Sequence, residues 1–199
     1  MIELIDSVDK QLLVFLNGFH NPFMDTVMWW VSSAPFWIPF YMGLLFLILR
    51  ARTVNWPKQD YKQWLFIAIS IGLAITLADQ ISSGFFKPFF GRFRPSHSPE
   101  LEGLVHLLTN PDGEIYKGGQ FGFVSSHAAN SFAVAWFVSS LLNTKATWRL
   151  MLFWAALVSY SRIYLGVHYP GDIIGGTIIG ILSGVVATKV YFYLDKKWG

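Results

Sequence analysis

Long apolar runs recur along this chain, and they constrain its fold more than any other feature. Five stretches carry few charges: residues 36–49, 64–86, 128–142, 148–164 and 173–194. A helix needs about 17 to 25 apolar residues to span the hydrocarbon core of a bilayer. The composition agrees, because only 14% of the residues are charged, against about 25% in ordinary soluble domains. The sequence therefore predicts an all-α fold, a polytopic membrane helical bundle.

The first of these spans begins in a proline-containing stretch. Pro35 and Pro39 would kink a helix there, because proline removes a backbone donor and crowds the preceding turn. The span either starts near Phe36 or extends back through the kink toward Met24. We therefore expect five to six transmembrane helices.

The N-terminal segment, residues 2–22, has a different pattern. Apolar residues recur at helical spacing with charged residues between them: Ile2, Ile5, Val8, Leu12 and Leu16 against Glu3, Asp6, Asp9 and Lys10. This pattern predicts an N-terminal amphipathic helix. Such a helix either lies in the membrane interface or packs on the rest of the bundle, and both placements suit the pattern.

Lysine and arginine residues predict the orientation, because they are enriched in cytoplasmic loops. With five spans, the turns after the first and third spans and the C-terminus share one side, and their basic residues are Arg50, Arg52, Lys58, Lys62, Lys145, Arg149, Lys196 and Lys197. Segments 87–125 and 162–172 then meet on the extracytoplasmic side. Their own basic residues depart from the charge rule: Lys87, Arg92, Arg94, Lys117 and Arg162. Residues that break a local rule are candidates for function.

Several classes of ligand are not expected. The basic residues form no aromatic-interleaved stripe, so we expect no nucleic acid partner. The chain has no cysteine, which excludes thiolate metal sites and disulfides. His20, His97 and His106 match no metal-ligand spacing. We therefore predict no metal and no cofactor.

The two extracytoplasmic segments contain groups suited to phosphate. Lys87, Arg94 and Arg162 supply three cations, and the arginine fork matches phosphate oxygens while lysine adds a point charge. Ser125 precedes the third span, so its hydroxyl and the backbone N–H groups of that helix's first turn could hold further oxygens. Taken singly, Lys87 and Arg94 could equally anchor helices at the interface. Together they predict a phosphate site.

Two histidines have distinct possible roles beside these cations. One imidazole can attack phosphorus, and the other can protonate the leaving oxygen. Asp172 follows His168 by four residues, so its carboxylate can accept the Nδ1 proton and leave Nε2 as the nucleophile. His127 has no carboxylate nearby in sequence and is better suited to be the acid. Alone, His168 and Asp172 could simply cap the fifth span.

These segments resemble the type 2 phosphatidic acid phosphatase superfamily, whose signature is KxxxxxxRP, PSGH and SRxxxxxHxxxD. The chain has Lys87…Arg94-Pro95, then Val124-Ser125-Ser126-His127, then Ser161-Arg162…His168…Asp172. The first and third parts match at every defined position. In the second, valine replaces proline and Ser126 replaces glycine.

The resemblance implies a metal-independent lipid phosphatase with a phosphohistidine intermediate. It makes His168 the nucleophile, Asp172 its partner and His127 the acid. The phosphate-binding residues would be Lys87, Arg94, Ser125, Ser126 and Arg162. We treat residues 1–199 as a single domain, with 1–34 as interfacial or partly spanning helices and 35–199 as the catalytic bundle.

The predicted location of the site implies a lipid substrate. Family analogy puts undecaprenyl diphosphate first, with phosphatidylglycerol phosphate, phosphatidic acid and lipid A phosphate as the other candidates. The predicted localisation is the bacterial inner membrane, with the active site facing the periplasm or exterior and membrane lipids as the neighbours. A lipid phosphotransferase and a non-catalytic lipid-phosphate carrier or flippase remain alternatives, and the oligomeric state is left open.

Overall fold

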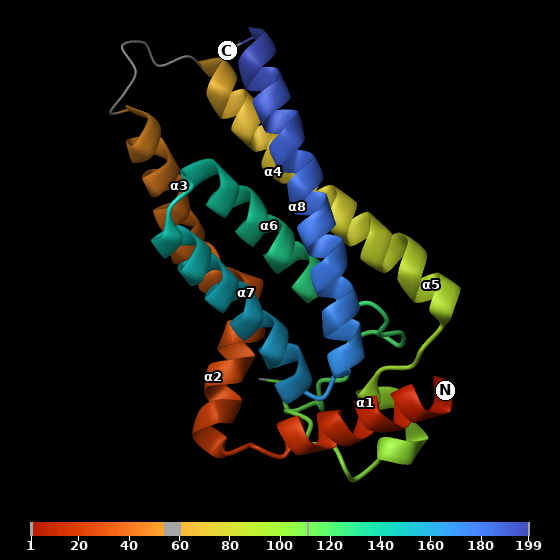
Figure 1. Ribbon diagram of the computed structural model, residues 1–199. Helices are drawn as coiled ribbons and strands as arrows, with labels where there is room; N and C mark the ends of the chain where they lie inside the picture. The colour runs from red at the N-terminus through yellow and green to blue at the C-terminus, as the bar shows by residue number, and fades with distance from the viewer. Residues whose placement is uncertain (1, 54–60, 111, 199) are drawn as a thin grey trace.

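The computed structural model describes residues 2–53, 61–110 and 112–198 (Figure 1). The α-helices are α1 Ile2–Asn17, α2 Pro22–Ser32, α3 Ile38–Thr53, α4 Tyr61–Asp79, α5 Lys87–Phe90, α6 Ser126–Leu142, α7 Lys145–Tyr164 and α8 Pro170–Trp198. Shorter helical turns are η1 Ala34–Trp37, η2 Gln80–Phe86, η3 Pro95–His97 and η4 Pro99–Leu101, of which η2 is π-helical. Within the described residues β-structure is limited to isolated bridges, which confirms the predicted all-helical fold.

The five predicted spans all fall on helices, but not all of these helices have the length and composition of a span. Two do, Tyr61–Phe90 and Pro170–Trp198, the first because α4, η2 and α5 run on without a break. The bent pair Pro22–Ser32 and Ala34–Ile48, with an angle of 76°, would make a third. The described part of the chain therefore supports two or three candidate spans, and five to six stays a prediction.

The bend between α2 and α3 lies where the sequence predicted a kink. Pro35 falls in the single turn η1 between the two helices. The indole of Trp37 donates to the carbonyl of Val31 across the bend, with an N···O distance of 2.8 Å. This hydrogen bond satisfies a carbonyl that the end of α2 would otherwise leave unpaired. Helical structure therefore continues from α3 back past Met24, interrupted by this bend.

The core of the bundle is the contact between α6 and α8. Gly176, Gly180 and Gly184 lie along α8 at four-residue spacing. A Cβ atom at Gly180 would collide with the carbonyl oxygen of Ala129, and one at Gly184 with that of Ala133. These two helix backbones therefore approach as closely as small-residue motifs allow in membrane proteins.

Helix α1 lies across the lower end of the bundle, transverse to α8 (Figure 1). Its apolar face, including Ile5, Val8 and Leu12, is exposed. Its opposite face packs on the bundle through Leu13, which is fully buried, and through Asn17, whose amide donates to the carbonyl of Tyr164 at 2.8 Å. Packing on the bundle and an exposed apolar face thus occur together in one helix.

The two ends of the bundle differ in their residues. At one end, α4 begins beside the end of α8, where Gln63 donates to Asp195 at 3.0 Å. The predicted cytoplasmic residues Lys62 and Lys196 belong to this end, whereas Lys58 lies outside the described residues. The other end holds α1, the segment 91–125 and the turn between α7 and α8 (Figure 1). The two segments predicted to form the site therefore meet.

Gly180→Ala should destabilise the bundle, because the new methyl group meets the backbone of α6. Overpacking of this kind costs about 1 to 3 kcal/mol. The matched control is Gly72→Ala in α4, where a Cβ meets nothing within 4 Å. Thermal unfolding of the purified protein in detergent should show a lower midpoint for Gly180→Ala alone. Equal midpoints for both variants would contradict this account of the helix contact.

Candidate functional site

His168 and Asp172 form a buried pair at the start of α8. The ring Nδ1 of His168 lies 3.1 Å from Oδ2 of Asp172, which also accepts the backbone N–H of Tyr169 at 3.1 Å. His168 is 1% exposed and Asp172 0%. His168 lies in the turn before α8 and Asp172 in its first turn, and their four-residue spacing brings the two side chains together. The carboxylate therefore fixes Nδ1 as the protonated ring nitrogen, and Nε2 is the nitrogen with a lone pair.

The surroundings of His168 keep its imidazole neutral. Burial is the main cause, followed by the charges of Arg94, Arg162 and Lys87, and together they hold the pKa of His168 well below its usual range. At pH 7 the ring is therefore unprotonated and able to act as a nucleophile. The same interactions show that all three predicted phosphate-binding cations lie close enough to act on this ring.

Arg162 comes from the last turn of α7 and is 2% exposed. One terminal nitrogen donates to the hydroxyl of Ser32 and the other to the hydroxyl of Tyr116, the latter at 3.0 Å. Its Nε is buried and has no hydrogen-bond partner among the described residues. Neutral hydroxyl groups therefore hold this guanidinium in place without neutralising its charge, and one donor is left over for an anion.

Arg94 is held in a similar way by the loop that precedes α6. Its Nε donates to the carbonyl of Phe121 at 3.2 Å, while its terminal nitrogens make no hydrogen bond within the described part of the chain. Gly118 has a φ of +66°, and a Cβ there would lie 2.8 Å from Nη1 of Arg94. The backbone can wrap this closely around the guanidinium only where glycine stands. Two free donor groups of Arg94 are thus presented to the site.

Lys87 reaches the site from the end of the π-helical turn η2. Its ammonium donates to Oγ of Ser126 at 2.7 Å and to Oγ of Ser83 at 3.2 Å. Ser82 also contacts Ser126, at 3.1 Å. Such π-helical turns occur frequently at functional sites. Ser126, which departs from the family signature, therefore contacts the lysine directly, so its hydroxyl orients a cation that the sequence predicts to bind phosphate.

Ser125 caps α6 and joins it to α8. Its side chain accepts the backbone N–H of Ala128, and its own N–H donates to the carbonyl of Asp172 at 3.0 Å. A Cβ at Gly122 would lie 2.9 Å from Oδ2 of Asp172 and 3.2 Å from Cγ of Arg94. The loop before α6 thus fits between the carboxylate and the arginine. The three predicted clusters converge at one place.

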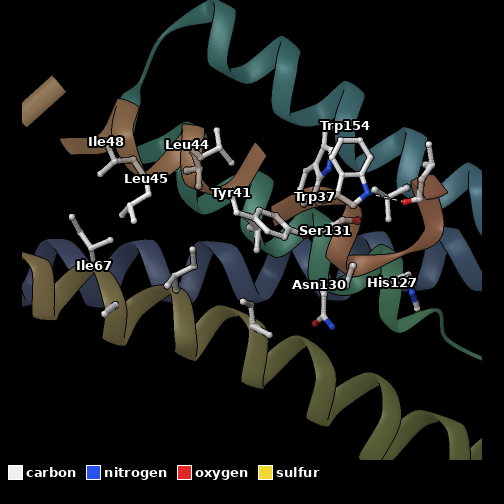
Figure 2. Close-up of a pocket in the computed structure, with 18 of the residues that line it drawn as sticks. Trp37, Tyr41, Leu44, Leu45, Ile48, Ile67, His127, Asn130, Ser131 and Trp154 are labelled. Carbon is white, nitrogen blue, oxygen red and sulfur yellow. Dashed lines mark hydrogen bonds between the residues drawn. The ribbon is translucent and has the colours of Figure 1, made fainter. Parts of the chain in front are cut away.

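His127 borders a large apolar cavity of about 810 Å³ (Figure 2). The cavity lies between α3, α4, α6 and α7, and its lining includes Trp37, Tyr41, Leu45, Ile67, Val138 and Trp154. Its polar lining residues, His127, Asn130 and Ser131, gather at one end (Figure 2). His127 is exposed, and it lines this cavity. The cavity therefore begins beside the cations.

Sequence reasoning missed several residues of this site. Ser32 and Tyr116 hold Arg162, and Ser82 and Ser83 surround Ser126, yet none lies in a recognisable motif. Their contacts arise only from tertiary packing. Asp79, an acidic residue within the second apolar run, accepts from the hydroxyl of Ser83 at 3.4 Å. In 2–53, 61–110 and 112–198 no group of three or more potential ligands could hold a metal ion.

An anion should bind the three cations and stabilise the fold. Orthovanadate or orthophosphate in the millimolar range should raise the melting temperature of the detergent-purified protein, since a ligand at 100 times its Kd adds about 2.7 kcal/mol. Arg94→Gln should abolish the shift because it removes the free donors. Arg149→Gln, on the exposed surface of α7, is the matched control. A full shift in Arg94→Gln would show that anions bind elsewhere.

Comparisons with known proteins agree with this geometry. The family model of the PAP2 superfamily matches residues 63–196. The lipid A 4'-phosphatase of Bacteroides thetaiotaomicron is 40% identical over 92% of this chain and 77% of its own length. Undecaprenyl-diphosphatase BcrC of Bacillus subtilis is 25% identical over 83% of this chain and 74% of its own. The crystal structure of a transmembrane PAP2-type phosphatidylglycerolphosphate phosphatase from Bacillus subtilis shares the fold, with a TM-score of 0.65 and 22% identity over 98% of this chain and 88% of that one. The chain belongs to the PAP2 superfamily.

Proposed function

We propose that this protein is an integral membrane lipid phosphatase that works through a phosphohistidine intermediate. The observation that carries the proposal is the neutral, buried His168, steered by Asp172 beside three cations. On this proposal residues 1–199 form one domain with five or six spans. The site faces the periplasm or exterior, where α1 lies in the interface.

The proposed reaction has two steps. Nε2 of His168 attacks phosphorus and the bond from phosphorus to the lipid oxygen breaks. Burial and the charges of Arg162, Arg94 and Lys87 lower the pKa of His127; the bound phosphate offsets these charges, so that His127 carries the proton that it gives to the leaving oxygen. Water, deprotonated by His127, then attacks the phosphohistidine and releases orthophosphate and free His168. Lys87, Arg94 and Arg162 hold the phosphate oxygens in both steps, and preorganised cations of this kind stabilise the charge of the transition state. The lipid alcohol is the other product.

We propose a lipid A phosphate monoester as the substrate. Undecaprenyl diphosphate came first on family analogy. A relative named lipid A 4'-phosphatase, however, is 40% identical to this chain, whereas relatives named undecaprenyl-diphosphatase are 25% and 29% identical. The apolar cavity of about 810 Å³ beside His127 suits a hydrocarbon chain attached near the phosphate. Undecaprenyl diphosphate stays the second candidate because of the BcrC relative.

Phosphate release from a lipid panel tests the proposal. Purified protein in detergent is given lipid A, undecaprenyl diphosphate, phosphatidylglycerol phosphate or phosphatidic acid, without added metal. We expect the highest kcat/KM on lipid A and no inhibition by EDTA. Adding acceptor lipids should not reduce free phosphate, whereas a phosphotransferase would divert it. No release from any lipid would refute the function, and a clear preference for undecaprenyl diphosphate would refute the substrate.

Three variants test the assigned roles. His168→Ala should lower kcat at least about 10³-fold, since it removes the nucleophile. Asp172→Asn should lower it about 10²- to 10⁴-fold, because an amide no longer fixes the productive tautomer. His20→Ala, an exposed imidazole outside the site, is the control and should keep full activity. A His168→Ala enzyme that still turns over would exclude the phosphohistidine.

A further inference from the structure

Arg92 is the one cation of the segment 87–94 that the family signature leaves without a role. Its Nη1 donates to Oδ1 of Asp172 at 3.1 Å and to Oδ2 of Asp9 at 2.9 Å, and its Nη2 donates to Oδ1 of Asp6 at 2.9 Å. Its guanidinium carbon lies 3.9 Å from the centroid of the Tyr169 ring. A single guanidinium therefore joins two acidic residues of α1 to the carboxylate that holds His168.

Helix α1 makes a second contact at the same place. The other oxygen of Asp9, Oδ1, accepts the backbone N–H of Gly171 at 2.7 Å. A Cβ at Gly171 would lie 2.7 Å from Oδ2 of Asp9, so only glycine permits this approach. Asp6, for its part, is paired with Lys10 at 2.7 Å. The polar face of α1 thus touches α8 one residue before Asp172.

The surroundings of Arg92 differ from those of the phosphate-binding cations. Burial opposes its charge, but the carboxylates of Asp172, Asp9 and Asp6 outweigh this and raise the pKa of Arg92. Arg94 and Arg162, by contrast, are held by a carbonyl group and by hydroxyl groups. Arg92 is therefore already neutralised by protein carboxylates, and it is unsuited to hold a phosphate.

We propose that Arg92 is a positioning residue, through which α1 fixes the carboxylate of Asp172 and so the orientation of His168. This inference deepens the proposed function and rests on it. Oδ2 of Asp172 serves His168 and Tyr169, while Oδ1 serves Arg92. Contacts on both oxygens stop the carboxylate from rotating. The N-terminal helix is then part of the catalytic structure, although it carries no signature residue.

Loss of Arg92 has a defined effect on the acid limb of the pH profile. The groups that face it are Asp6 and Asp9 from α1, Asp172 from α8 and Tyr169 from the preceding turn, with Lys10 beyond Asp6 and His168 beyond Asp172. A cation beside the His168–Asp172 pair disfavours protonation of that pair. Removing it lets the pair bind a proton at higher pH, and a protonated imidazole is no nucleophile. The acid limb of kcat should therefore move to higher pH.

The test compares Arg92→Gln and Arg92→Lys with the wild-type enzyme on its best lipid substrate. We expect Arg92→Gln to lower kcat about 10- to 100-fold, the range for a small misplacement of a reacting group, with KM nearly unchanged and the acid limb shifted upward. Arg92→Lys should restore the position of the acid limb but only part of kcat, since an ammonium lacks the fork that spans three carboxylates. Glu100→Gln is the control. It removes the ion pair between Lys10 of α1 and Glu100 but leaves the contacts of Arg92 intact.

Asp9→Asn separates the two contacts of α1. An asparagine can still accept the N–H of Gly171 but loses the charge that holds Arg92, so it should reproduce the kcat loss in weaker form while keeping the melting temperature. A wild-type kcat and pH profile in both Arg92→Gln and Asp9→Asn would overturn the proposal. A loss that appears in KM alone would instead place Arg92 on the substrate, and would also overturn it.

A second readout keeps this proposal distinguishable from the proposed function. NMR of the imidazole of ¹⁵N-labelled His168 in detergent reports its tautomer and titration without any substrate. We expect a single Nδ1–H tautomer in the wild type, and mixed tautomers with protonation at higher pH in Arg92→Gln. If no lipid is hydrolysed, the proposed function fails, but this result still decides the role of Arg92. Identical spectra in both proteins would overturn it.

Discussion

The buried carboxylate of Asp172 is the interaction on which the site depends. Removing a carboxylate from water costs several kcal/mol unless hydrogen bonds and a partner charge compensate for it. Asp172 obtains them from His168, the N–H of Tyr169 and Arg92, while its own carbonyl accepts the N–H of Ser125. Three segments far apart in sequence, those of Arg92, Ser125 and His168, therefore meet at one residue. The contacts that orient the imidazole of His168 are therefore also contacts that pack this end of the bundle.

Three helices of this bundle, α6, α7 and α8, begin at local signals that are visible in the sequence. Thr144 and Ser125 accept backbone N–H groups as N-caps, and Pro170 begins α8 with the φ that a first helical residue needs. The number of spans was harder to predict. Helix α6 has 17 residues, many of them buried against α7 and α8, so protein contacts replace the lipid contacts that the apolar-length rule assumes.

The site was predictable only where sequence spacing reports spatial proximity. His168 lies in the turn just before α8 and Asp172 in its first turn, so their four-residue separation is enough to predict the contact. Arg92 and Asp6 are 86 positions apart, and no local pattern links an acidic residue of an amphipathic helix to a cation in a distant loop. From the sequence alone, the charged face of α1 could equally have faced solvent. Its real partner followed only from the packing of α1 against the bundle.

The groups that hold each arginine differ with the role that we propose for it. Arg92 is surrounded by carboxylates, whereas hydroxyl groups from Ser32 and Tyr116 and a carbonyl from Phe121 hold the other two arginines. Neutral acceptors fix a guanidinium and leave its field intact. In a water-poor site this field is stronger than in bulk solvent, and a phosphate carrying two negative charges gains more from it than a lipid with one. On the proposed function, a preference for phosphate would follow from the lack of carboxylate partners around these two arginines in the described residues.

The relation between the cavity and the two histidines completes the mechanism. In-line displacement at phosphorus requires the nucleophile and the leaving oxygen on opposite sides. His127 lines the apolar cavity, whereas His168, among the described residues, does not. A lipid whose chain occupies that cavity would carry its ester oxygen toward His127 and turn the far side of its phosphate toward Nε2 of His168. The apolar cavity would then do more than bind the chain, because its position would determine which imidazole attacks and which donates the proton.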